Sequence, residues 1–293
     1  MSRVDRPIIV VGTGRCGSTM FHRILARHSH LGWLSTWNET LPAQPLLSPF
    51  SNLYRTPLPI SLRHQRWFPK PFEAYRFWEH YLPGFSRRER PLTADDVPEA
   101  AIEPLRRAVA SVTRLQRRGR FLAKVTGWSR MLYFDRIFPD ARFIHITREP
   151  RAVVSSWAQA GWLDVTSGPD SDAWQWGHVP PNYRRAWEEL GGAPELSAAL
   201  KIRLDLDDIE ANSRGLPGRV HELRYERLIT QPDDALRGVL DFCDLPWNRA
   251  WQRRVAALRF YDPSNKWKQY LSEEQGARIL QFFGRAEDDA RAA

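Results

Sequence analysis

Residues 7–20 read PIIVVGTGRCGSTM. The apolar run at the start of this stretch is typical of a buried parallel strand, and we expect a helix to begin at Ser18 or Thr19. Three glycines lie in the intervening turn: Gly12, Gly14 and Gly17. Such a turn directs backbone N–H groups and the positive end of a helix at one point. Together with the charge of Arg15, it predicts a site for a phosphate or a similar anion.

The composition limits the class of protein. The chain has 293 residues, 42% of them hydrophobic, so it is long enough for a large α/β domain with a substantial core. No apolar run is long enough to span a membrane, and the one near the N-terminus is too short for a signal peptide, so we expect a cytoplasmic protein. Two cysteines argue against a disulfide framework or a zinc cluster. The net charge of +9 favours anionic partners without selecting one.

Strands and helices alternate along the rest of the chain. Further strands are expected at 121–126, 142–147 and 220–223. Helices are expected at 18–28, 131–138, 150–160, 183–190, 232–243, 247–258 and 272–283, with another capped at Thr93 and closed by Gly119. This alternation predicts a three-layer α/β fold, with a mostly parallel sheet between helices. No linker is evident, so we expect one domain over residues 1–293, with insertions at 40–92 and 161–216.

The glycine turn is compatible with three kinds of nucleotide site. A dinucleotide-binding fold needs an acidic residue about twenty positions on, where Glu39 stands, but Arg15 and Cys16 inside the turn are unusual for it. A P-loop kinase needs a lysine where this chain has Ser18, and a magnesium ligand that the sequence does not supply. In the third kind, Arg15 holds a terminal group with less charge than a γ-phosphate, and no metal is required.

Residues 12–19 resemble the 5′-phosphosulfate loop of sulfotransferases that use 3′-phosphoadenosine 5′-phosphosulfate (PAPS), in the variant with Arg in place of Lys. The resemblance implies a P-loop nucleoside-triphosphate-hydrolase-like fold, PAPS as co-substrate and no metal. It also implies which residues contact the 5′-phosphosulfate. These are Gly14, Arg15, Cys16, Gly17, Ser18 and Thr19.

A second anion site is expected in residues 143–156, which read FIHITREPRAVVSS. Arg148 leaves the end of a strand, and Ser156 lies on the helix that follows. A cation and a hydroxyl there can share one phosphate. The spacing resembles the 3′-phosphate motif of the same family. The alternative is a surface ion pair between Arg148 and Glu149.

Two later segments resemble the family as well. In residues 223–228 the resemblance places Tyr225 near the adenine, although an ordinary tyrosine at a strand end is the alternative. Residues 264–268 resemble a basic segment that closes over the nucleotide phosphates through Lys266 and Lys268. The alternative there is a solvated pair of lysines.

For catalysis, the resemblance assigns Arg15 and Lys124 to the leaving group. Cytosolic small-molecule sulfotransferases place a histidine two residues after that lysine, where this chain has Thr126. Other branches use a glutamate shortly after the first helix, which makes Glu39 the candidate general base. A surface glutamate that caps a turn is the alternative. We expect the remaining histidines near these motifs to face solvent or neighbours, or to be structural: His22, His28, His30 and His145.

The sequence thus predicts a PAPS-dependent sulfotransferase acting on a hydroxyl or amine of a small-molecule, glycan or lipid acceptor. The alternatives are a P-loop kinase with a degenerate lysine and a basic nucleic-acid-binding protein. Insertions 40–92 and 161–216 are expected to shape acceptor choice. Aromatic side chains suit sugars, sterols or phenols, so tryptophans could line the acceptor site. The candidates are Trp33, Trp37, Trp67, Trp78, Trp157, Trp162, Trp174 and Trp176. The position of Cys16 beside a helix N-terminus predicts a lowered thiol pKa.

Overall fold

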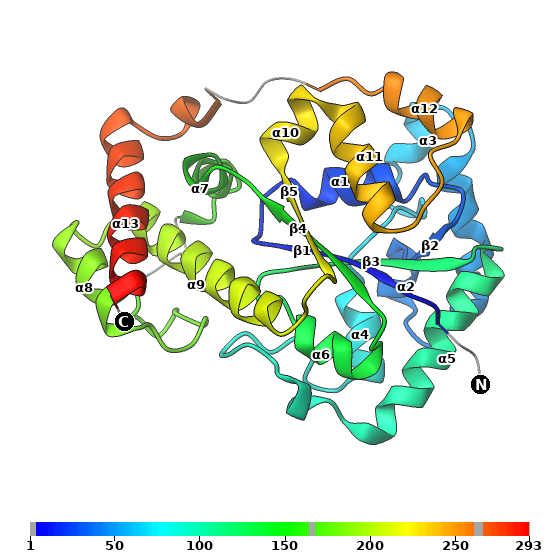
Figure 1. The fold of residues 1–293 in the computed structure, drawn as a ribbon, viewed down its shortest axis with the longest axis horizontal. Helices are drawn as coiled ribbons and strands as arrows, with labels where there is room; N and C mark the ends of the chain where they lie inside the picture. Colours follow the sequence, from blue (N-terminus) through cyan, green and yellow to red (C-terminus); the bar gives the residue numbers. More distant parts are fainter. Residues whose placement is uncertain (1–3, 164–167, 261–265, 293) are drawn as a thin grey trace.

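The computed structural model describes residues 4–163, 168–260 and 266–292. Its central sheet consists of β1 (Ile8–Gly12), β2 (Leu31–Trp33), β3 (Arg120–Thr126), β4 (Arg142–Thr147) and β5 (Val220–Arg224). The strands lie in the order β2-β3-β1-β4-β5, and every neighbouring pair is parallel. Figure 1 shows helices on both sides of this sheet. The predicted three-layer α/β fold of P-loop type is confirmed.

The sequence predicted four of these strands and missed β2. Three residues are too few to show an alternating pattern. The strand depends on distant partners: Trp33 lies opposite Leu122 of β3. A Cβ on Gly32 would lie 3.1 Å from Thr113 Cα, so the absence of a side chain allows helix α5 (Glu99–Leu115) to approach. Tertiary packing therefore creates this strand.

The α-helices and 3₁₀-helices occupy most of the remaining chain. The α-helices besides α5 are α1 (Ser18–Leu25), α2 (Thr36–Thr40), α3 (Ile60–His64), α4 (Tyr75–Tyr81), α6 (Met131–Ile137), α7 (Pro150–Gln159), α8 (Pro181–Glu189), α9 (Pro194–Arg214), α10 (Tyr225–Thr230), α11 (Pro232–Phe242), α12 (Arg249–Ala256) and α13 (Glu273–Ala292). The 3₁₀-helices are η1 (Pro45–Arg55), η2 (Ala94–Asp96) and η4 (Lys266–Gln269). The first helix ends three residues before the predicted boundary at 28, and α10 was not predicted.

Strand β1 shows why both faces of the sheet are covered. Its residues alternate between two hydrophobic clusters, because successive side chains of a strand point to opposite faces. Ile8 and Val10 pack with residues of α1, α11 and α12, whereas Ile9 and Val11 pack with residues of α4, α5 and α6. All five residues of β1 are buried, which explains the continuous apolar run in the sequence.

Helix α9 lies in a third cluster with α7, α8 and α13, at the left of Figure 1. Its residues from Glu195 to Asp205 are all buried. A helix surrounded by protein needs no apolar stripe, and this part of α9 has buried residues on every side. None of the described helices combines the length and apolarity needed to cross a membrane.

Three of the histidines named above are buried: His145 on β4, and the pair His22 and His28. The His28 Nε2 atom lies 3.1 Å from the Pro246 carbonyl oxygen, and burial lowers the pKa of His28 to about 4. Burial, together with the charge of Lys124, holds the pKa of His22 well below its usual value. The side chains of His22 and His28 face neighbours in the core rather than solvent, and both favour the neutral form.

The carboxyl ends of the strands meet at one edge of the sheet, where α/β proteins bind their ligands. In the register of the sheet, Gly12 lies opposite Thr126 of β3 and Val11 lies opposite His145 of β4. The loop after β1, the end of β3 and the turn after β4 therefore reach the same edge.

Candidate active site

The glycine loop joins β1 to α1, and its backbone conformation depends on glycine. Gly17 has φ 93° and directly precedes α1. A Cβ on Gly17 would lie 2.3 Å from Tyr225 Cδ2, so the tyrosine ring packs directly on the loop backbone. Arg15 also has a positive φ, 70°, which is uncommon for a residue with a side chain and is often found at functional sites. The loop is held in a conformation that local propensity alone does not favour.

Replacing Gly17 with alanine should destabilise the fold more than the same change at Gly191, which provides a matched control. Both residues have φ 93°, but a Cβ on Gly191 would meet nothing within 4 Å. The left-handed backbone costs alanine about 1–2 kcal/mol at either site. At Gly17, overpacking against Tyr225 should add roughly 1–3 kcal/mol. Urea unfolding of the two variants measures the difference, and a Tyr225→Ala background should abolish it. Equal destabilisation would contradict the packing argument.

Arg148 lies against the glycine loop. Its Nη1 donates to the Arg15 carbonyl oxygen at 3.2 Å, and its Cζ lies 4.6 Å from the centre of the Tyr225 ring. Arg15 Nε in turn donates to Ser156 Oγ at 3.0 Å. The two motifs, far apart in the sequence, therefore form one continuous cluster of positive charge.

The ion pair between Arg148 and Glu149 considered above does not form. Glu149 Oε1 lies 2.6 Å from Arg151 Nε, and its carboxylate also caps α7 by accepting from the Arg151 and Ala152 N–H groups. Among the described residues, no carboxylate pairs with Arg148, and its buried Nε has no hydrogen-bond partner. A partly buried guanidinium with an unused donor is suited to an anionic ligand.

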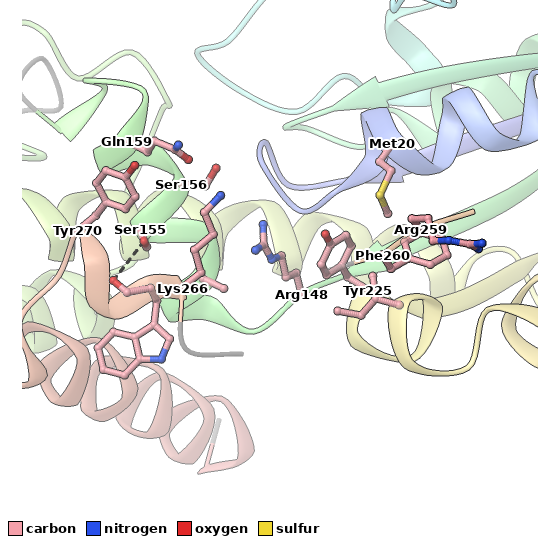
Figure 2. A pocket seen from close by; sticks show the side chains of 13 residues that line it. Met20, Arg148, Ser155, Ser156, Gln159, Tyr225, Arg259, Phe260, Lys266 and Tyr270 are labelled. Carbon is pink, nitrogen blue, oxygen red and sulfur yellow. Dashed lines mark hydrogen bonds between the residues drawn. The ribbon is translucent and has the colours of Figure 1, made fainter. Parts of the chain in front are cut away.

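A cavity of about 320 Å³ adjoins this cluster; we call it the basic cavity. It is lined by Met20, Arg148, Ala152, Ser155, Ser156, Gln159, Tyr225, Ile229, Arg259, Phe260, Lys266, Trp267 and Tyr270. Figure 2 shows Arg148, Ser156 and Lys266 around the same part of it; the first two come from the junction of β4 and α7, and Lys266 comes from the distant C-terminal segment. Ser155 is directed elsewhere, because its hydroxyl donates to the Trp267 carbonyl oxygen at 3.3 Å.

The two predicted lysines of the C-terminal segment have different surroundings. Lys266 lines the basic cavity. Lys268 does not, and its Nζ lies 2.9 Å from Glu273 Oε1 in an exposed ion pair. Ser264 and Asn265, from the same motif, lie outside the described residues.

Lys124 is buried on β3 and reaches the start of α1. Its Nζ donates to Thr19 Oγ1 at 2.7 Å and lies 2.6 Å from Glu73 Oε1. The same Glu73 oxygen accepts from Thr126 Oγ1 at 3.0 Å. Glu73 was missed by sequence reasoning, because it precedes α4 in the segment 40–92, where no periodicity or motif marks it.

Glu39, the predicted base, has a different environment. Its Oε2 accepts the backbone N–H of Arg76 at 3.0 Å, near the start of α4. It lines neither the basic cavity nor the cleft described next. The contact of Glu39 with a backbone N–H group is therefore the one expected of a glutamate that caps a turn, which was the alternative to a general base.

A second cleft, of about 490 Å³, is lined in part by Gly14 of the glycine loop; we call it the aromatic cleft. Gly14, Glu73 and Thr126 contribute to its lining, together with Tyr75, Ser86, Arg87, Arg88, Gly127, Trp128, Arg130, Trp157, Trp162, Gln175, Trp176, Lys201 and Asp205. Three of the eight tryptophans predicted to line the acceptor site lie in this cleft, namely Trp157, Trp162 and Trp176. Trp128 also lines it but was not predicted. Trp33 and Trp78 instead belong to the hydrophobic core.

The predicted effect on Cys16 is wrong. Its thiol points into the core and is fully buried, and burial raises its pKa despite nearby hydrogen bonds. A Cβ on Gly12 would lie 2.8 Å from Cys16 Sγ. Any contact of Cys16 with an anion in the loop must therefore involve its backbone N–H.

Comparison with known proteins agrees with this geometry. The model of the sulfotransferase family matches residues 7–249. The chain is 24% identical over 247 residues to an uncharacterised protein of Aquifex aeolicus (strain VF5); the match covers 83% of this chain and 26% of that protein, so the chain spans about a quarter of its length.

Two solved structures have a similar fold. Sulfotransferase STF9 from Mycobacterium avium has a TM-score of 0.57 at 18% identity, over 98% of this chain and 77% of that one. Sulfotransferase STF1 from Mycobacterium tuberculosis H37Rv has a TM-score of 0.53 at 16% identity, over 97% and 77%. With the family model matching most of its length, this chain belongs to the sulfotransferase family.

Proposed function

We propose that this protein transfers a sulfuryl group from PAPS to a hydroxyl or amine of an acceptor. The contacts of the glycine loop carry the proposal, because the loop touches residues of both the basic cavity and the aromatic cleft. Arg15 bonds Ser156 of the basic cavity, while Gly14 lines the aromatic cleft. A transfer between two substrates requires both to reach one point, and we place that point at this loop, which contacts both spaces.

The residues of the basic cavity fit a nucleotide with two anionic ends. Arg148 has an unused buried donor, and Ser156 and Lys266 line the same space, so these three would hold the 3′-phosphate. Arg15 and the backbone of residues 14–19 would hold the 5′-phosphosulfate. Tyr225 also lines the cavity, so its predicted place near the adenine stays part of the proposal.

In the reaction, the bond between sulfur and the bridging oxygen of the 5′-phosphate breaks, and a bond from sulfur to the acceptor atom forms. Negative charge develops on the bridging oxygen, where preplaced cations and donors lower the barrier. Lys124 is already positioned against Thr19 at the start of α1, and Arg15 lies within the loop. Their positive charges would stabilise the departing 3′,5′-adenosine bisphosphate.

The acceptor must lose a proton to a base. Glu73 fits this role because its carboxylate lines the aromatic cleft and lies beside Lys124. Glu39 remains the candidate that the family resemblance suggests. Geometry favours Glu73, since a general base must lie within hydrogen-bond reach of the proton it takes.

We further propose that the chain acts as one domain whose two insertions shape acceptor choice. Segment 40–92 contributes Glu73, Tyr75 and residues 86–88 to the aromatic cleft, and segment 161–216 contributes Trp162, Gln175, Trp176, Lys201 and Asp205. A cytoplasmic location stays an expectation from the sequence.

Thermal stabilisation by ligands tests the function. At one hundred times its dissociation constant, a ligand adds about 2.7 kcal/mol to stability. We expect 3′,5′-adenosine bisphosphate to stabilise the protein without added metal, and ATP with magnesium or oligonucleotides to have little effect. Stabilisation only by ATP with magnesium would support the kinase alternative, and stabilisation only by oligonucleotides the nucleic-acid alternative. Either outcome would refute the proposal.

A further inference from the structure

The aromatic cleft has one wall built from tryptophan side chains. The Trp157 ring centre lies 5.3 Å from that of Trp162 and 6.0 Å from that of Trp176, both in edge-on arrangements. The Trp157 ring therefore packs against both of the others. Trp128 lines the same cleft, and Lys201 Nζ lies 4.4 Å from the centre of its ring. Flat aromatic faces favour a planar or ring-shaped ligand.

The cleft also carries positive charge that is not matched by the carboxylates lining it. Among the described residues, no hydrogen bond or ion pair engages the guanidinium of Arg87, and Arg88 donates only to Gln175 Oε1, at 3.3 Å. Arg130 is buried, and its N–H groups donate to the carbonyl oxygens of Phe85, Trp128 and Arg87. Three guanidinium groups therefore line the cleft, and within residues 4–163, 168–260 and 266–292 no carboxylate is hydrogen-bonded to any of them.

The carboxylates of the cleft already have cationic partners. Glu73 pairs with Lys124, and Asp205 pairs with Lys201. Two further carboxylates lie near Arg87 but do not line the cleft, and their oxygens accept backbone N–H groups. Glu79 accepts from Gly84 and Ser86, and Glu89 accepts from Arg88. Within the part of the chain that the structure describes, an anionic ligand would thus meet the guanidinium groups of Arg87 and Arg88 without displacing a hydrogen-bonded carboxylate.

We infer that the acceptor is a hydroxylated ring compound bearing an anionic group such as a carboxylate. The ring lies against the tryptophan wall, the hydroxyl faces Glu73 and Gly14, and the anionic group contacts Arg87 and Arg88. This inference rests on the proposed function, because it treats the aromatic cleft as the acceptor site. The inference narrows the acceptor class from hydroxyl compounds in general to hydroxyl compounds that also carry an acidic group.

Three probes that share a phenol ring test the charge preference. These are 4-hydroxyphenylacetate, the neutral 2-(4-hydroxyphenyl)ethanol and the cationic tyramine. Titrations at low salt, followed by tryptophan fluorescence, should show the anion binding roughly tenfold more tightly than the neutral probe, and the cation most weakly. The double variant R87A/R88A should lose the preference for the anion while keeping its affinity for the neutral probe. The double variant R107A/R114A is the matched control, because it removes the same charge from helix α5.

Equal affinity for the three probes, no quenching by any of them, or an unchanged preference in R87A/R88A would overturn the inference. Loss of the preference in R107A/R114A would also do so, since net charge rather than the cleft would then be responsible. These titrations need no donor nucleotide. Failure of 3′,5′-adenosine bisphosphate to bind would therefore refute the proposed function without affecting the measured charge preference, and the two failures are distinguishable.

Discussion

Replacing Glu73 with glutamine is expected to lower the rate of sulfuryl transfer by about 10²–10⁴-fold, the range that a general base contributes. Glutamine keeps the shape of the side chain, and its amide oxygen can still accept from Lys124 and Thr126, but it cannot take a proton. The affinity for 3′,5′-adenosine bisphosphate should stay the same, because Glu73 lines the aromatic cleft and not the basic cavity. Single-turnover transfer to an acceptor that supports wild-type turnover measures the effect.

Glu39→Gln is the matched control for this prediction. It makes the same chemical change in the same part of the chain, at a carboxylate whose observed contact is the backbone N–H of Arg76. We expect its transfer rate to change by less than about threefold, because no proton of the acceptor lies within its reach. A large loss in Glu39→Gln with little loss in Glu73→Gln would reverse the assignment and support the family-based prediction.

The second large effect concerns the donor. Replacing Arg148 with alanine should weaken binding of 3′,5′-adenosine bisphosphate by roughly 10–150-fold, since a hydrogen bond to a charged group contributes about 1.5–3 kcal/mol. Arg148 has no carboxylate partner among the described residues, so the variant leaves no unpaired acid of the protein behind. Isothermal titration calorimetry measures the dissociation constant directly. Arg148→Lys should retain part of the affinity, because it keeps the charge but loses the planar fork.

Arg136→Ala controls for the loss of one positive charge. Arg136 lies on α6, and its Nη2 is 2.9 Å from Glu99 Oε2 in an exposed ion pair. Its removal should change the dissociation constant by less than about twofold, because exposed charges are screened over such distances. Similar losses in Arg136→Ala and Arg148→Ala would show that Arg148 acts only through net charge, which would contradict the proposed 3′-phosphate site.

The elements that were predicted correctly from the sequence are those whose signals come from residues adjacent in the chain. The strand, glycine turn and helix of residues 7–20 were predictable because each signal is local: an apolar run, three glycines and a helix start. The junction from β4 to α7, which carries Arg148 and Ser156, was predictable in the same way. Strand β2 was not evident, because it has only three residues.

The properties of the candidate site, like the elements of the fold, include some that local sequence cannot decide. Whether Arg148 pairs with Glu149 could not be decided from the sequence, since Arg151 competes for the same carboxylate and obtains it only in the folded chain. The thiol of Cys16 was expected to be activated by its neighbours in the loop. Its burial in the core has the larger effect, and the sequence gives no measure of that burial.

The amino-acid sequence alone determined the strand, glycine turn and helix of residues 7–20, the strand-to-helix junction at Arg148 and the parallel α/β fold, because the signals for these elements are local. Only the tertiary structure joined Glu73 to Lys124, brought the two motifs into contact through Arg15 and assembled the tryptophan wall with arginines beside it. The physical reason is that these contacts join segments that are distant in the sequence. Side chains far apart along the chain meet there only after the core has packed.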